Sequence, residues 1–313
     1  MDKSTDYDVI VVGAGPAGLT AALYLSRAKV KTLVIDSGIA GGQTILTHEI
    51  ANYPGIERIS GYQLAHIMKK QAESFGTEIK INAEIERIVL DRRIKEIKLK
   101  KNENIYTAKA VIFSLGGRSR TIGATKEEYF KGKGISYCAT CDGDFFTDKE
   151  IVVVGGGNSA LEEAVSLTKY ASKVTIVHQF DYFQAFPHAI EEAKKNTKIN
   201  FMLNSRITAF NGDEKIESVD IENIKTKEIT PFKTDGVFIF IGYLPNTELV
   251  EHALMLNEWK EIIVKSDMST NVEGVYAAGD CINKKIRQVT TAVADGTVAA
   301  LSAIEYVMNF KSK

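Results

Sequence analysis

VIVVGAGPAG, at residues 9–18, has the pattern of a buried parallel strand that ends in a glycine turn. An apolar helical run to Ala28 and a second strand at residues 31–36 follow it. The same order of elements returns in IVVVGGGNSA at residues 151–160, with a helix to Ala171 and a strand at residues 174–178. Each unit also has a later apolar strand that ends in glycine, at residues 111–117 and 237–242.

Two related dinucleotide-type domains are the simplest account of this repeat. We expect an α/β protein with two three-layer ββα, Rossmann-like nucleotide-binding domains. Turn-rich stretches near residues 117–120 and 243–247 are the best candidates for domain seams. After the second seam the chain returns to a strand-like segment and a long C-terminal helix. We therefore predict a discontinuous first domain, residues 1–118 and 247–313, and a second domain, residues 119–246.

Local patterns predict further elements. A helix that begins at Ser60 and ends at Gly76 would carry an apolar face of Leu64, Ile67, Met68, Ala72 and Phe75. Pro187 opens another short helix, at a position where proline is tolerated. Residues 78–90 and 94–99 alternate between apolar and polar side chains, and we expect antiparallel strands there.

The composition limits the possible functions. A chain of 313 residues is about two domains long. Its 39 Lys and Arg nearly balance its 40 Asp and Glu, so it lacks the basic field of a nucleic-acid-binding protein. The longest apolar stretch, residues 9–25, is interrupted by glycine and proline and is not expected to span a membrane.

The cysteine count and the N-terminus indicate the compartment. Three cysteines favour a reducing environment over an extracellular disulfide scaffold. Residues 1–8 hold three Asp and one Lys, unlike the basic start of a secretory signal. We expect a cytoplasmic protein.

The first glycine turn is expected to bind a dinucleotide. Gly13, Gly15 and Gly18 let backbone N–H groups approach a pyrophosphate at a helix N-terminus. Asp36 lies 23 residues after Gly13, at a strand end, where a carboxylate can accept hydrogen bonds from a ribose. Asp280 follows a strand-like segment and small residues, and it can bond a ribityl chain, which favours a flavin. The alternative is a glycine turn that serves only packing.

The segment CATCD, residues 138–142, points to redox chemistry. Cys138 and Cys141 can bridge, and a disulfide that alternates with a dithiol carries two electrons and two protons. A helix that begins here would lower a thiol pKa, and Asp142 could protonate a leaving thiolate. Zinc needs four ligands, but only Cys281 remains, so we expect no metal site. We expect Cys281 to be a small buried apolar residue.

These motifs together resemble the low-molecular-weight thioredoxin reductases. The resemblance follows nearly the whole chain in order and includes GGQ at residues 41–43, NYPG at residues 52–55 and RQV at residues 287–289. It implies an FAD/NAD(P)-linked reductase fold, a homodimer, FAD in the first domain and thioredoxin as a partner. Cys141 would face the flavin, Cys138 would attack the thioredoxin disulfide, and Asp142 would be the general acid. The expected FAD contacts are Gly13, Gly15, Pro16, Ala17, Gly18, Asp36, Gly42, Gln43, Asn52, Gly116, Asp280, Arg287, Gln288 and Val289.

One segment departs from the NADPH-dependent members of that family. Their second domain holds the 2′-phosphate with a His-Arg-Arg-x-x-x-Arg run, whereas residues 178–184 here are HQFDYFQ. Residues 174–193 contain no Lys or Arg, and each charge-assisted bond to a phosphate is worth roughly 1.5–3 kcal/mol. His178 lies 23 residues after Gly155, where an NADH site favours a carboxylate. The segment therefore lacks both the cations expected to bind the 2′-phosphate of NADPH and the carboxylate expected to bind the ribose of NADH.

This departure resembles the ferredoxin-dependent flavin thioredoxin reductases, which do not use a pyridine nucleotide. The resemblance implies that ferredoxin donates single electrons to FAD. Because ferredoxins are usually acidic, Lys284, Lys285 and Arg287 form a candidate docking patch, with a solvated loop as the alternative. The aromatic residues after the second domain's strand are expected to be core, or a lid over an unused cleft: Phe180, Tyr182, Phe183 and Phe186.

Two other functions stay open. One is an NADPH- or NADH-dependent thioredoxin reductase with an atypical ribose pocket. The other is a flavoprotein that is not a disulfide reductase, and the pair Cys138 and Cys141 argues against it.

Overall fold

The chain divides into two compact units in a computed structural model that describes residues 5–47, 49–100 and 104–310. Unit 1 comprises Met1–Arg118 and Leu244–Lys313, and unit 2 comprises Ser119–Tyr243. The segments that join them, β7 (Gly117–Ser119) and β16 (Tyr243–Pro245), pair as a two-stranded sheet. The α/β class with Rossmann-like sheets is confirmed, because each unit is built on a parallel sheet.

Parallel strands form the centre of unit 1. They run in the order β3 (Glu78–Lys80), β2 (Thr32–Ile35), β1 (Tyr7–Val12) and β6 (Ile105–Phe113), and β17 (Val275–Ala277) also pairs with β6. The register sets Val12 opposite both Ile35 and Phe113, and Phe113 opposite Ala277. The carboxyl ends of four strands therefore meet at one edge, where ligands bind in open α/β sheets.

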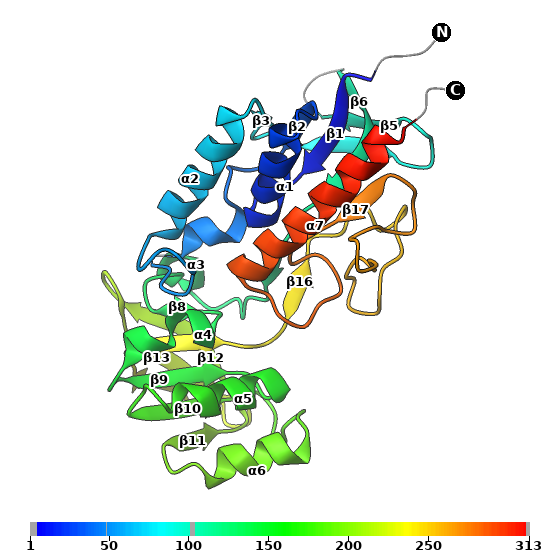
Figure 1. Cartoon of the computed structure of the whole chain (residues 1–313). Helices are drawn as coiled ribbons and strands as arrows, with labels where there is room; N and C mark the ends of the chain where they lie inside the picture. Colours follow the sequence, from blue (N-terminus) through cyan, green and yellow to red (C-terminus); the bar gives the residue numbers. More distant parts are fainter. Residues whose placement is uncertain (1–4, 48, 101–103, 311–313) are drawn as a thin grey trace. The chain divides into compact units, whose positions relative to one another are not determined.

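Two layers cover the unit 1 sheet. On one face lie α1 (Pro16–Arg27), α2 (Gly61–Ser74) and α7 (Val289–Met308), and α7 runs beside α1 (Figure 1). Gly296 makes that close approach possible, because a Cβ there would overlap the carbonyl oxygen of Ala17. The first half of β6 also pairs with the antiparallel strands β5 (Lys95–Leu99) and β4 (Ile85–Val89), so the sheet continues beyond β6. Side chains of β5 and β4 pack with the opposite face of the parallel strands in a second apolar cluster.

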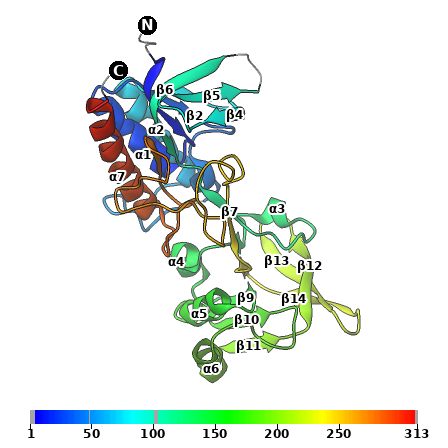
Figure 2. The ribbon, with the colours of Figure 1, turned by 90° about the vertical axis from the view of Figure 1, so that its right-hand side faces the viewer.

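Unit 2 repeats this three-layer plan. Its parallel sheet has the order β11 (Ile199–Met202), β10 (Lys173–Val177), β9 (Glu150–Val154), β15 (Gly236–Ile239) and β8 (Ile135–Ser136). The helices α5 (Asn158–Leu167) and α6 (Pro187–Lys195) lie on one face (Figure 2). On the other face lies an antiparallel sheet of β12 (Ser205–Gly212), β13 (Ile216–Asn223) and β14 (Ile229–Lys233), next to the short helix α3 (Glu127–Phe130) (Figure 2).

Three local predictions need correction. Residues 78–90 do not form one antiparallel strand, because β3 adds to the open edge of β2 in parallel and only β4 turns back. The apolar face of α2 is narrower than expected, since Ile67 and Phe75 are 51% and 43% exposed. Helix α5 ends at Leu167 rather than at Ala171.

Other local predictions are confirmed. Ser60 caps α2 in a capping box with Gln63, and Pro187 is the first residue of α6. Within the described residues, we find no helix that combines the length and the apolar character needed to cross a bilayer.

Candidate functional site

The three glycines of the first turn differ in how much space surrounds the position of a Cβ atom. Gly13 has a φ of +104°, which side chains rarely adopt, and a Cβ on Gly18 would overlap the carbonyl oxygen of Gly13. These two glycines are required by the packing of the turn itself. A Cβ on Gly15 would meet only Gly42 Cα, at 4.0 Å, so Gly15 keeps space open at the start of α1. Packing alone therefore does not explain Gly15.

Asp36 is fixed beside this turn, directly after β2. Its Oδ2 accepts a hydrogen bond from the Ala14 N–H at 2.6 Å, and its Oδ1 accepts one from the Gly38 N–H at 2.7 Å. Each carboxylate oxygen has a second lone pair, so the anchored group can still accept a hydroxyl. Asp36 has the position and the acceptor capacity expected of a ribose ligand.

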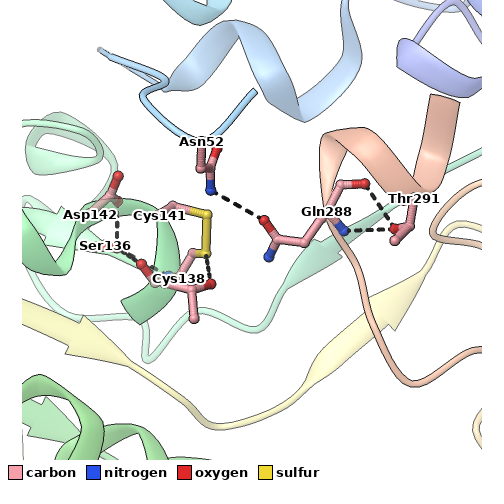
Figure 3. The surroundings of a disulfide bond; sticks show 8 residues. Asn52, Ser136, Cys138, Cys141, Asp142, Gln288 and Thr291 are labelled. Carbon is pink, nitrogen blue, oxygen red and sulfur yellow. Dashed lines mark hydrogen bonds between the residues drawn. A yellow bond between two sulfur atoms is a disulfide. The ribbon is translucent and has the colours of Figure 1, made fainter. Parts of the chain in front are cut away.

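Two further segments are fixed in unit 1, one against this turn and one at the start of α7 (Val289–Met308). The Gly41 N–H donates to the Ala14 carbonyl at 2.7 Å, which brings the 3₁₀ helix η1 (Gly42–Leu46) against Gly15. The Asn52 side chain donates to Gln288 Oε1 at 3.4 Å, at the start of α7 (Figure 3). Of the remaining expected FAD contacts, Gln43 is exposed and Val289 is the first residue of α7, whereas Gly116 has a φ of +58° with open space around it.

Asp280 lies next to the first turn of α1. The Ala278 N–H donates to the Phe113 carbonyl at 2.9 Å, and a Cβ on Gly279 would come within 2.9 Å of the Ala17 Cβ. The Oδ1 atom of Asp280 is buried, and no hydrogen-bond partner reaches it among the described residues. Burial raises the pKa of this carboxyl, while Lys284 and Arg287 act in the opposite direction.

The residues of this edge fit a flavin dinucleotide. A buried acceptor without a partner costs about 1–3 kcal/mol, and a ligand hydroxyl would satisfy Asp280 Oδ1. The open space at Gly15 suits a pyrophosphate, and Asp36 suits a ribose. All of the expected FAD contacts belong to unit 1. Direct contact with FAD stays a prediction for each of them.

The docking patch predicted from Lys284, Lys285 and Arg287 needs correction. The Lys284 side chain is only 13% exposed and forms an ion pair with Asp295 at 2.6 Å. Arg287 pairs with Glu261 and donates to the Asp280 carbonyl at 3.4 Å. Lys285 alone is exposed, so the local basic patch is smaller than the sequence suggested.

Cys138 and Cys141 form a disulfide in unit 2, with their Cα atoms 5.3 Å apart. Cys138 is the N-cap residue of the single helical turn α4 (Ala139–Asp142), Cys141 lies within that turn, and both are partly exposed. Thr140 Oγ1 lies 3.5 Å from Cys138 Sγ. A disulfide sulfur carries no hydrogen, so the Thr140 hydroxyl is the donor in this contact.

Asp142 is held against the base of this turn. The Ser136 hydroxyl donates to Asp142 Oδ2 at 2.6 Å and accepts from the Cys138 N–H at 3.1 Å (Figure 3). Burial raises the pKa of the Asp142 carboxyl, the Ser136 hydrogen bond opposes that rise, and nearby Asp144 adds to it. A carboxyl with a raised pKa holds a proton closer to neutral pH, as a general acid requires.

Ser136 is a partner of Asp142 that was not predicted from the sequence. A hydroxyl residue two positions before the first cysteine was the available signal, but its side chain turns toward Asp142 only because β8 ends there. Cys281 is fully buried, as expected, and burial raises its thiol pKa to about 11. The described residues contain no group of three or more His, Cys, Asp or Glu side chains suited to a metal ion.

The second glycine turn is covered by its own chain. Gly155 has a φ of +141°, and a Cβ on Gly156 would overlap the ring of His178. The Gln184 N–H donates to the Gly156 carbonyl at 2.8 Å, and the Phe186 N–H donates to Asn158 Oδ1 at 2.7 Å. The loop after β10 is therefore hydrogen-bonded to the turn.

His178 adds no charge to this turn. Burial lowers the pKa of its imidazole, and its Nε2 lies 3.1 Å from the Tyr182 carbonyl. A carbonyl can only accept, so Nε2 carries the hydrogen. The ring of Phe183 stacks on His178 with the centroids 5.7 Å apart. A neutral imidazole in this position cannot replace the guanidinium groups that hold a phosphate.

The aromatic residues of this loop are only partly core. Phe183 packs against Phe201, whereas Tyr182 and Phe186 are 58% and 70% exposed. A cation does reach the loop from a distant segment, because Lys225 Nζ lies 3.2 Å from Asp181, which neutralises it. The core alternative holds for Phe183 and fails for Tyr182 and Phe186, and a lid over the cleft stays a prediction for these two.

The chain is similar to proteins of one well-defined group. The profile of the pyridine nucleotide-disulphide oxidoreductases matches residues 7–296. A protein of Clostridium pasteurianum, named a 34.2 kDa protein in the rubredoxin operon, is 46% identical over 98% of this chain and 99% of its own. A thioredoxin reductase of Peptoclostridium acidaminophilum is 47% identical over 96% of this chain and 97% of its own. The crystal structure of thioredoxin reductase from Streptococcus pyogenes superimposes with a TM-score of 0.93 at 39% identity and covers 97% of this chain and 99% of its own.

Proposed function

We propose that this protein reduces thioredoxin with electrons from reduced ferredoxin. The chain belongs to the pyridine nucleotide-disulphide oxidoreductases and, among them, to the low-molecular-weight thioredoxin reductases. FAD in unit 1 and the Cys138–Cys141 pair in unit 2 would carry the electrons. The thioredoxin reductase activity rests on the Cys138–Cys141 disulfide. The choice of ferredoxin as donor rests on the second glycine turn, Gly155–Gly157, and the loop bonded to it.

The single observation that carries the disulfide reductase function is the Cys138–Cys141 bond next to Asp142. Both cysteines are partly exposed, on one short turn that presents them to a partner. When bound, FAD supplies the electron pair that opens this bond. Two electrons and two protons convert the disulfide to a dithiol.

Residues of unit 2 then carry out the proton transfer and the thiol–disulfide exchange. Asp142, whose carboxyl pKa is raised by burial, would donate its proton to the thioredoxin sulfur that leaves as a thiolate when Cys138 attacks. The Thr140 hydroxyl stabilises Cys138 as a thiolate. Cys138 attacks the disulfide of oxidised thioredoxin and forms a mixed disulfide. Cys141 then attacks Cys138, which restores the disulfide and releases reduced thioredoxin.

Ferredoxin is the proposed donor because the second nucleotide turn lacks the partners of a nicotinamide coenzyme. Residues 174–193 contain no Lys or Arg, and His178 is neutral and already bonded to Tyr182. The bond between Gln184 and Gly156 also holds the loop against the turn. Lys285 remains the exposed candidate for an acidic donor.

The competing function is an NADPH- or NADH-dependent reductase of the same fold. It is favoured by the description of the matching family, which names a pyridine nucleotide. For NADPH, a cation such as Lys225 would have to leave Asp181 to bind the 2′-phosphate, whereas NADH carries no such phosphate. An anaerobic titration of the oxidised enzyme with NADPH, NADH or reduced ferredoxin separates the two functions.

A homodimer in the cytoplasm completes the proposal. The family resemblance supports the homodimer, and the low cysteine count supports a reducing compartment. Light scattering of the purified protein would test the first, with a single species at twice the 34.5 kDa chain mass as the expected result.

The disulfide half is tested with Cys138→Ser. The variant should retain bound FAD and lose thioredoxin reduction with any electron donor, dithionite included. Cys281→Ala is the matched control, because Cys281 is a buried free thiol, and it should keep full activity. Thioredoxin reduction by Cys138→Ser at the wild-type rate would show that the dithiol is not the site.

A further inference from the structure

A largely buried ion pair lies beside the loop of residues 279–288, which contains the expected FAD contacts Asp280, Arg287 and Gln288. Lys284 Nζ and Asp295 Oδ2 are 2.6 Å apart, and the two side chains are 13% and 15% exposed. Lys284 also donates to Thr291 Oγ1 at 3.2 Å. Most other ion pairs among the described residues have at least one well-exposed partner. This pair is therefore not an ordinary surface contact.

Asp295 bonds the beginning and the middle of the loop. It lies in the second turn of α7, and its Oδ2 accepts a hydrogen bond from the Gly279 N–H at 3.2 Å as well as one from Lys284. Thr291, which Lys284 contacts, is also bonded to the N–H of Gln288 at 3.1 Å. Residues 279–288 are thus fastened to α7 at their beginning, middle and end.

Lys284 also faces the carboxylate inside that loop. Its Nζ lies 3.6 Å from Asp280 Oδ1, which is too long for a hydrogen bond but close enough for a strong electrostatic effect. This oxygen is the buried acceptor that has no hydrogen-bond partner among the described residues. The positive charge therefore lies next to the atom that a flavin hydroxyl would reach.

We propose that Lys284, held by Asp295, is a positioning residue for FAD: it keeps residues 279–288 closed on α7 and keeps Asp280 ionised as an acceptor for the ribityl chain. The proposal rests on the proposed function, because it concerns the same flavin. Lys284 would not touch the reacting atoms. It would act through Asp280.

The charges around Asp280 determine the sign of the expected effect. Lys284 and Arg287 stabilise the carboxylate, Asp295 destabilises it, and Glu261 engages Arg287 from outside the loop. The influence of Lys284 is larger than that of Asp295. Removal of both charges should therefore raise the pKa of Asp280, so that Asp280 becomes protonated, and loses the strength of a charged acceptor, at a higher pH than in the wild type.

The test uses Lys284→Met and the double variant Lys284→Met/Asp295→Asn. The single change leaves Asp295 unpaired and can destabilise the fold, whereas the double change removes both charges and keeps an amide oxygen that can accept from the Gly279 N–H. Lys285→Met is the matched control, because Lys285 is the exposed neighbour. Each holoenzyme is dialysed against known FAD concentrations from pH 5 to pH 8, bound flavin is measured by absorbance, and circular dichroism checks the fold.

The double variant should bind FAD roughly 10- to 100-fold more weakly at the acidic end, the worth of one charge-assisted hydrogen bond. The pH at which half of the affinity is lost should be higher than in the wild type, and Lys285→Met should match the wild type. Unchanged affinity would overturn the proposal. Weaker binding with an unmoved midpoint would also overturn it, because the pair would then be only structural. Wild-type protein that takes up no FAD would instead contradict the proposed function.

Discussion

The hydroxyl of Ser136 donates a hydrogen bond to the carboxylate of Asp142 at 2.6 Å, and the same oxygen accepts the N–H of Cys138 at 3.1 Å. One side chain therefore links the proposed general acid to the cysteine that would attack thioredoxin. Because burial raises the pKa of Asp142, the acid can retain its proton beside a newly formed thiolate.

Replacement of this acid should slow turnover without affecting the flavin. Asp142→Asn keeps the size of the side chain but cannot deliver a proton, so thioredoxin reduction should fall by about 10²–10⁴-fold. The measurement is steady-state thioredoxin reduction with dithionite-reduced enzyme. Asp144→Asn, at an exposed carboxylate two positions later, should retain nearly the full rate. Equal rates for the two variants would remove Asp142 from the mechanism.

The same variant should change how stability depends on pH. An aspartate with a raised native pKa binds its proton more tightly in the folded state than in the unfolded state, so stability falls as pH rises toward that pKa. Asparagine does not titrate. Asp142→Asn should therefore melt at a higher temperature than wild type at pH 7, and the gain should shrink near pH 4. Calorimetry at the two pH values measures it, and a gain that grows toward acid would contradict the burial argument.

Gly15 should be dispensable for folding and required for the flavin. A Cβ at this position has its nearest described atom 4.0 Å away, so Gly15→Ala should fold, but the methyl group would fill space that a pyrophosphate needs. We expect purified Gly15→Ala to be nearly colourless, with the circular dichroism spectrum of the apoprotein. Gly38→Ala, whose Cβ would also be free of close contacts, should stay yellow. A yellow Gly15→Ala protein would mean that the dinucleotide does not approach here.

The three cysteines should react in two separate classes. Cys138 and Cys141 are bridged, and Cys281 is fully buried with a thiol pKa raised to about 11. A thiol reagent at pH 7 should label none of them in the native oxidised protein, two after reduction, and the third only in denaturant. Rapid labelling of Cys281 in the native protein would show that this part of the unit 1 core opens.

The sequence predicted the sheet edges well because parallel strands have short, continuous apolar signals. Residues 9–18 and 151–160 mark the two turns, and the strand ends place Asp36 and Asp280 at the same edge. The CATCD segment likewise predicted that Cys138 and Cys141 can bridge, and the structure contains this disulfide. Each of these signals is local, so it can be read without the tertiary structure.

The errors concern residues whose environment is set by distant parts of the chain. The sequence around Lys284 resembles a solvated loop, yet the Lys284 side chain is largely buried and forms an ion pair with Asp295 of α7. Residues 78–80 alternate like an antiparallel strand, but the open edge of β2 decides their direction. Ser136 gains its role only where β8 and α4 bring it against Asp142. No periodicity or motif reports such contacts.

The identity of the electron donor is tested most directly by one anaerobic titration. Oxidised enzyme is mixed with NADPH, NADH or reduced ferredoxin, and the visible flavin absorbance is followed. We predict rapid loss of this absorbance with ferredoxin and none with either nicotinamide, because residues 174–193 supply no Lys or Arg to the turn at Gly155–Gly157 and the loop is hydrogen-bonded to this turn through Gln184. Rapid bleaching by micromolar NADPH or NADH would contradict the account.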